Sequence, residues 1–270
     1  MNCRLSHHFP NSSFLRGVCV LAVLLILCSC DRKPAAQLDL YPAQETRIKY
    51  QVDWQKALYT KRIEQFKKEP IGKDKVVLLG NSLTEGGGDW GERFGVNFII
   101  NRGISGDITE GVLVRLGEIF HYQPKAVFLL IGVNDIFNAD HPNRQEITTQ
   151  YVAQNIICIA QEITSHLPET SVFIQTLLPV NKEIYFKEKG WFPEHAVPLN
   201  RQINEINELL KRSSGHEVID LHSAFVDGEG NLDKIYTTDG VHLSEAGYKL
   251  WVKILTDYVT PYSHNSRIKN

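Results

Sequence analysis

Five short runs of apolar, largely β-branched residues recur along the chain, and segments with helical spacing separate them. Such runs, without polar alternation, are typical of strands that are buried on both faces of a sheet. The repeated order of strand and helix predicts an α/β fold with a parallel sheet that is covered on both sides. The runs lie at residues 76–79, 97–100, 126–131, 171–176 and 217–220.

The length of the chain limits the number of domains. With 270 residues, of which 43% are hydrophobic, it has material for one α/β core and little for a second. We therefore expect a single domain over residues 51–262, followed by a C-terminal tail at 263–270. In a parallel sheet, ligands bind beyond the carboxyl ends of the strands, so polar residues at those ends are the first candidates for a site. The predicted helices cover residues 53–68, 109–121, 144–166, 199–212 and 244–258.

Residues 1–29 have the organisation of a signal peptide. Basic residues precede an apolar run at 17–27, which is roughly half as long as a membrane-spanning helix needs to be. The string Leu27-Cys28-Ser29-Cys30 resembles the lipobox of bacterial lipoproteins, which implies acylation of Cys30 and a lipid anchor in the cell envelope. A plain secretory signal or a short uncleaved anchor is the alternative. Residues 30–50 then form a lipidated N-terminus and a polar tether.

Four polar strings lie where predicted strands end or a helix begins. Ser82 is either a nucleophile or a helix N-cap. Gly103 either presents its N–H to an oxyanion or turns the chain, and Asn134 either donates to an oxyanion or caps a turn. Asp239 precedes His242 closely enough for its carboxylate to orient the imidazole. Serine, histidine and aspartate at such positions indicate a serine esterase.

The order of these strings resembles that of the SGNH/GDSL hydrolases over about residues 75–258. Within that family, residues 101–107 and 113–116 resemble the platelet-activating-factor acetylhydrolase-like and carbohydrate acetylesterase branches. The resemblance implies a three-layer α/β/α sandwich with a flavodoxin-like parallel sheet of about five strands. It also implies that Ser82 is the nucleophile, His242 the base and Asp239 the residue that orients it. The oxyanion hole would consist of the N–H groups of Ser82 and Gly103 and the side chain of Asn134.

One residue departs from the family pattern. The family's Gly-Asp-Ser-Leu is Gly80-Asn81-Ser82-Leu83 here. Because an asparagine still accepts a backbone hydrogen bond and holds the turn, we expect activity to survive. Asn81 and Trp191 are candidates for substrate contact. Trp191 belongs to an aromatic and charged segment at 181–198, which either lines the substrate pocket or packs its aromatic side chains on the core as a surface loop.

These observations predict a lipid-anchored envelope esterase that removes small acyl groups, above all acetyl, from a glycan or related substrate through an acyl-enzyme. The segments 86–90 and 181–198 have compositions that suit a shallow site open to a polar alcohol. The alternatives are a lysophospholipase or thioesterase for longer acyl chains, and a glycan-binding lipoprotein without catalysis. We expect no metal or other cofactor, since no histidine pair has metal-ligand spacing on one helix. A net charge of -2 without a basic stripe argues against nucleic acid as a partner.

Overall fold

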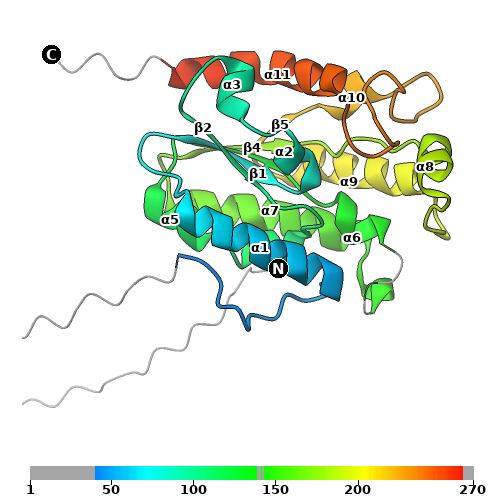
Figure 1. Cartoon of the computed structure of the whole chain (residues 1–270), viewed down its shortest axis with the longest axis horizontal. Helices are drawn as coiled ribbons and strands as arrows, with labels where there is room; N and C mark the ends of the chain where they lie inside the picture. The colour runs from blue at the N-terminus through cyan, green and yellow to red at the C-terminus, as the bar shows by residue number, and fades with distance from the viewer. Residues whose placement is uncertain (1–39, 139–140, 142, 264–270) are drawn as a thin grey trace, which may run out of the picture. The chain divides into compact units, whose positions relative to one another are not determined.

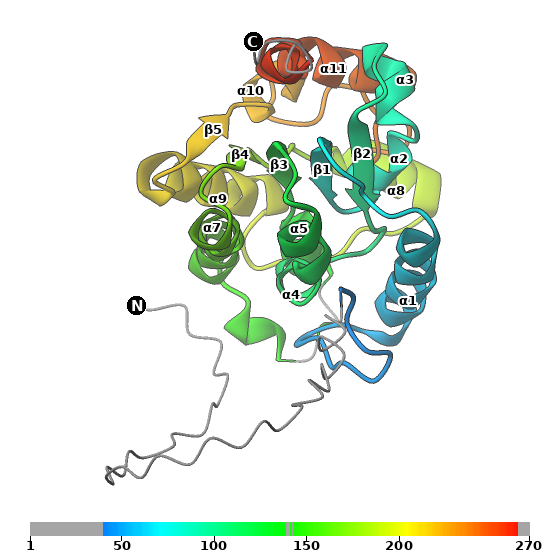
Figure 2. The same ribbon diagram turned by 90° about the vertical axis from the view of Figure 1, so that its left-hand side faces the viewer.

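A five-stranded parallel sheet with the order β2-β1-β3-β4-β5 forms the centre of the domain. The computed structural model describes residues 40–263, except 139, 140 and 142. Helices cover both faces of the sheet (Figures 1 and 2). The predicted three-layer α/β/α sandwich with a flavodoxin-like strand order is therefore confirmed. The strands are β1 (Val76–Gly80), β2 (Ile99–Gly103), β3 (Ala126–Leu130), β4 (Ser171–Gln175) and β5 (Glu217–Ile219).

Each face of the sheet has its own hydrophobic core. Helices α2, α3, α10 and α11 contribute to one core, and α1 and α4 to α9 contribute to the other. Every residue of β1 and β3 is buried, because these strands have neighbours on both sides and helices on both faces. The helices are α1 (Asp53–Lys68), α2 (Ser82–Gly86), α3 (Trp90–Phe94), α4 (Thr109–Leu113), α5 (Gly117–Tyr122), α6 (Val133–Phe137), α7 (Thr149–His166), α8 (Lys182–Lys189), α9 (Leu199–Ser213), α10 (His222–Phe225) and α11 (Glu245–Val259), with 3-10 turns η1 (Arg144–Glu146) and η2 (Thr260–Tyr262).

Two of the predicted helices are interrupted. The segment 109–121 divides into α4 and α5, and the break contains Arg115, whose buried guanidinium donates to Asp107 and to the carbonyl oxygens of Arg102 and Gly80. The segment 144–166 divides into η1 and α7, because Thr148 caps α7 through its hydroxyl. Helical spacing alone does not reveal such breaks.

Two other segments are more ordered than expected. Residues 181–198 begin with the helix α8, which Asn181 caps by accepting the N–H of Ile184. The segment expected to be a tether packs on the domain over residues 40–50, where Tyr41 donates to Glu118 at 2.9 Å and Tyr50 is buried. Cys30 and the predicted signal peptide lie outside the described residues. In the part of the chain that is described, no helix has the length and apolar character needed to cross a membrane.

Candidate active site

Ser82 follows the carboxyl end of β1. In the sheet, β1 lies between β2 and β3, so the connections after β1 and after β2 lead to opposite sides of this strand. Asn81, and not Ser82, caps α2, because its side chain accepts the N–H of Leu83 at 3.0 Å. Ser82 is the first residue of α2, and its hydroxyl is therefore not used as a cap. The Ser82 Oγ lies 3.2 Å from Nε2 of His242.

The loop 237–243 places the imidazole opposite that hydroxyl. Asp239 Oδ2 lies 2.9 Å from Nδ1 of His242, and its other oxygen accepts the backbone N–H of His242 at 2.8 Å. Gly240, at φ +89°, lets the loop approach the start of α8, where its carbonyl accepts the N–H of Asn181 at 2.7 Å. Ser82, His242 and Asp239 thus form a continuous chain of contacts, as the sequence predicted.

The charge of Asp239 fixes the orientation of the ring. Burial disfavours the ionised carboxylate, but hydrogen bonds from the His242 side chain and from two backbone N–H groups hold the pKa of Asp239 well below its ordinary value. An ionised Asp239 accepts a hydrogen bond from Nδ1–H of His242, which leaves Nε2 of His242 as the acceptor for the serine hydroxyl. Lys189, at the end of α8, lies 3.4 Å from the same Oδ2 and adds a cation to the pair.

Asn134 completes the group from the third strand. It is the second residue of α6, directly after β3, and its side chain lines the same cavity as Ser82 and His242. Its Nδ2 donates to the carbonyl of Asp107 at 2.9 Å. An amide nitrogen carries two hydrogens, so one remains for a ligand in the cavity.

Gly103 is not part of this group, contrary to the prediction. It is the last residue of β2, its N–H donates to the side chain of Asn101, and it does not line the cavity. Gly106, three residues later, lines the cavity at φ +78°. Its N–H makes no hydrogen bond with any residue that the structure describes. The strand was expected to end at Ile100, and this error of three residues put the glycine of interest in the wrong place.

The two candidates for substrate contact differ in position. Asn81 is 1% exposed and does not line the cavity, because its side chain is used to cap α2. Trp191 is 51% exposed and lies at the cavity. The predicted role of the segment 181–198 in the pocket is therefore consistent with the positions of Tyr185 and Trp191, whereas residues 86–90 do not line the cavity at all.

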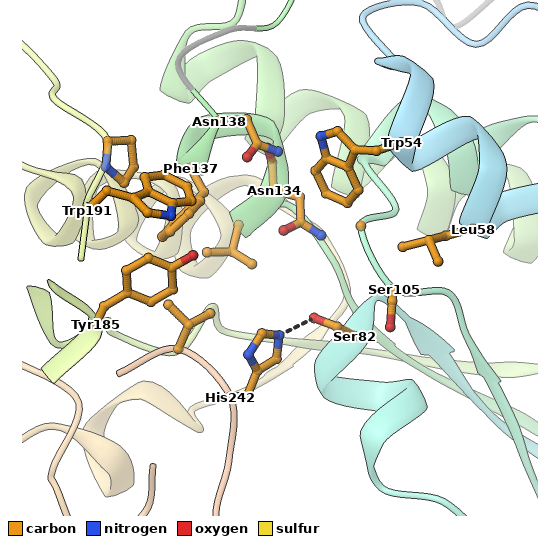
Figure 3. Close-up of a pocket in the computed structure, with 14 residues that line it drawn as sticks. Trp54, Leu58, Ser82, Ser105, Asn134, Phe137, Asn138, Tyr185, Trp191 and His242 are labelled. Carbon is orange, nitrogen blue, oxygen red and sulfur yellow. Dashed lines mark hydrogen bonds between the residues drawn. The ribbon is translucent and has the colours of Figure 1, made fainter. Parts of the chain in front are cut away.

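The cavity has a volume of about 640 Å³, and its walls are mainly apolar. Figure 3 shows Ser82 and His242 in contact, with Tyr185, Phe137 and Trp191 on one side and Trp54 and Leu58 on the other. The sequence did not point to Trp54, which lies in α1 and precedes all four polar strings. The cavity is lined by Trp54, Leu58, Ser82, Ser105, Gly106, Val133, Asn134, Phe137, Asn138, Tyr185, Trp191, Pro193, Val241 and His242.

Two buried carboxyl groups support the loop at residues 104–108, between β2 and α4. Burial raises the pKa of Asp107 to about 6, although Arg115 opposes the shift. Burial likewise raises the pKa of Asp135 to about 7, against hydrogen bonds from the hydroxyl and N–H of Thr109. Neither carboxyl group lines the cavity, so both act on the position of the loop. Within the described ranges, no three histidine, cysteine or acidic side chains form a set of metal ligands.

Known proteins share this architecture. A family model described as GDSL-like Lipase/Acylhydrolase matches residues 78–250. Platelet-activating factor acetylhydrolase IB subunit alpha1 from Homo sapiens is 32% identical over 188 residues, which cover 65% of this chain and 72% of that protein. The crystal structure of a GDSL-like lipase from Bacteroides thetaiotaomicron has a TM-score of 0.58 at 22% identity and covers 75% of this chain and 98% of its own, which supports the fold. The chain belongs to the GDSL-like lipase/acylhydrolase family.

Proposed function

We propose that this protein is a serine esterase that removes small acyl groups, above all acetyl, from a glycan or related substrate. The observation that carries the proposal is the continuous contact from Asp239 through His242 to Ser82, at the wall of a cavity that also contains Asn134. A hydroxyl with a base in hydrogen-bond reach, and a third group that orients the base, is the arrangement that activates a serine. Family membership as an acylhydrolase agrees with this chemistry.

The proposed reaction proceeds through an acyl-enzyme. Oγ of Ser82 attacks the ester carbonyl carbon while Nε2 of His242 accepts the hydroxyl proton, and the carbonyl electron pair moves to the oxygen. The tetrahedral intermediate then expels the alcohol, which takes the proton from His242. Water repeats the same two steps on the acyl-Ser82 ester, and it releases the carboxylic acid and the free serine.

Three donors would stabilise the oxyanion. The N–H of Ser82 lies at the start of α2, and neither it nor the N–H of Gly106 is engaged by a described residue. The remaining Nδ2 hydrogen of Asn134 is the third donor. We thus assign to Gly106 the role that the sequence suggested for Gly103. Each such donor contributes roughly 3 to 4 kcal/mol in the transition state.

The size of the acyl group separates two candidate functions. Human platelet-activating factor acetylhydrolase, the relative described above, is named for an acetyl group, and this supports an acetyl ester. The apolar lining, including the buried side chains of Val133 and Phe137, instead favours a longer acyl chain and hence a lysophospholipase or thioesterase. We retain the acetylesterase as the first proposal and the longer-chain enzyme as the second.

A chain-length series tests both candidates. For an acetylesterase, kcat/KM on p-nitrophenyl esters is highest for acetate and falls through butanoate to octanoate, and acetylated glycans release acetate. A rate that climbs steadily to octanoate would favour the second function, since each methylene buried adds ~0.8 kcal/mol. Hydrolysis of all the esters by Ser82→Ala at the wild-type rate would contradict both.

We further propose that Cys30 carries a lipid that anchors the protein in the bacterial envelope. The proposal is based on the string Leu27-Cys28-Ser29-Cys30 after an apolar run. Full-length protein made in a bacterial host should incorporate labelled palmitate and partition into detergent, whereas Cys30→Ala should do neither. Equal labelling of the two proteins would contradict acylation at Cys30.

A further inference from the structure

Helix α1 reaches the cavity from outside the region that the family model matches. The family match begins at residue 78, whereas α1 ends at Lys68. Two of its side chains, Trp54 and Leu58, line the cavity and are 47% and 39% exposed. Large apolar side chains at this exposure on a cavity wall are available to a ligand.

Trp54 lies directly on the loop that presents Gly106. A Cβ atom on Gly106 would come within 2.5 Å of Cζ3 of Trp54, so the indole packs against the α-carbon of this glycine. No larger residue fits at position 106 without moving the indole. The side chain of Trp54 therefore covers the loop and at the same time presents its other edge to the cavity (Figure 3).

Polar contacts hold α1 in this position. Arg62 donates from Nε to the carbonyl of Gly103 at 3.0 Å and lies 3.5 Å from Glu85. Glu85 in turn accepts the N–H of Ser105 at 2.6 Å, and Tyr59 donates to the carbonyl of Gly111 at 2.9 Å. The wall formed by Trp54 and Leu58 is thus fixed to both ends of the loop.

The charge of the cavity limits the ligand that this wall contacts. Among the described residues, no aspartate, glutamate, lysine or arginine lines the cavity. A charged group placed there would lose its hydration without gaining a partner of opposite charge, which is costly. The lining therefore favours an uncharged group over a charged one.

The exposure of the walls separates the two parts of an ester. Val133 and Phe137 line the cavity with only 7% of each residue exposed, whereas Trp54 and Trp191 are about half exposed and lie on opposite sides (Figure 3). The acyl group stays on the serine until water removes it, while the alcohol leaves to solvent first. The exposed wall is consequently in the path of the alcohol.

We propose that α1 is a recognition element of this enzyme, in which Trp54 and Leu58 bind the apolar face of an uncharged alcohol such as a neutral sugar. The inference rests on the proposed esterase function for the identity of the ligand as an ester. It assigns substrate selectivity to a helix that precedes the family region and lies opposite the aromatic segment with Trp191.

Two acetyl esters that differ only in the alcohol test the assignment. Acetate release is measured for ethyl acetate and for fully acetylated xylobiose. Trp54→Ala should raise KM for the xylobiose ester by about tenfold more than KM for ethyl acetate, because only the larger alcohol reaches the indole, whereas a shift of the Gly106 loop would affect both esters alike. Trp54→Phe should keep KM for the xylobiose ester close to the wild-type value. Lys61→Ala, an exposed change on the same helix, serves as the control.

An equal loss of activity on both esters would overturn the proposal, because Trp54 would then only support the Gly106 loop. An unchanged KM for the xylobiose ester would overturn it as well. Binding of acetylated xylobiose to Ser82→Ala, followed by tryptophan fluorescence, separates this from a failure of the esterase proposal. Trp90 and Trp251 are fully buried and do not line the cavity, so a change in fluorescence on binding reports on Trp54 and Trp191. Affinity should fall about tenfold when Trp54→Ala is added, even if the wild type releases no acetate. Equal affinities would refute the role of α1 as a recognition element.

Discussion

Replacing Asn134 by alanine removes the one side-chain donor that we assign to the oxyanion hole. The oxyanion exists only in the transition state, so kcat should fall by about 10² to 10³ while KM changes little. The same substitution removes the hydrogen bond from Nδ2 to the carbonyl of Asp107. That bond contributes about 1 kcal/mol to folding, and its loss should lower Tm by a few degrees.

Steady-state kinetics on p-nitrophenyl acetate and thermal unfolding measure the two effects separately. Asn134→Asp is the matched variant, because it keeps the size of the side chain and replaces the donor by a charged acceptor. Its kcat should be at least as low as that of Asn134→Ala. A rise in KM with unchanged kcat would refute the reasoning and make Asn134 a substrate-binding residue.

Two other predictions concern the charged groups around the site. Asp239→Asn should lower kcat strongly, because the amide no longer selects the Nδ1–H tautomer; an unchanged kcat would refute this. Burial raises the pKa of Asp135 to about 7 in the fold, so its carboxyl group ionises more easily in the unfolded chain. The free energy of unfolding of the wild type should therefore fall as pH rises from about 4 to 7. The loss is about 1.4 kcal/mol per pH unit at most, and urea unfolding of Asp135→Asn should lack this part of the slope.

The sequence predicted the sheet well, because buried parallel strands produce uninterrupted apolar runs. Each of the five predicted runs overlaps a strand, and the ends of β1 and β3 were placed within one residue. β2 was the exception. Its second half contains Asn101 and Arg102, whose polar side chains hid a strand that continues to Gly103. Arg102 is buried there because Glu118 accepts from its guanidinium at 2.9 Å.

The positions of strand and helix ends also decided which residues of the site the sequence could reveal. Ser82, Asn134, Asp239 and His242, which the structure brings close together, could be singled out because each lies close to the end of a recognisable element. Gly106 was missed because the end of β2 was misplaced. The apolar cavity was missed because its walls come from α1, α6, α8 and the loop before His242, and no single segment of the sequence shows their common composition.

Covalent labelling of the serine tests the central claim most directly. A fluorophosphonate should react once with the purified protein, and peptide mapping by mass spectrometry should place the adduct on Ser82, since its hydroxyl lies 3.2 Å from the base. Ser82→Ala should neither take up the label nor hydrolyse p-nitrophenyl acetate. An adduct on another residue, or a Ser82→Ala variant with wild-type hydrolysis, would contradict the assignment of Ser82 as the nucleophile.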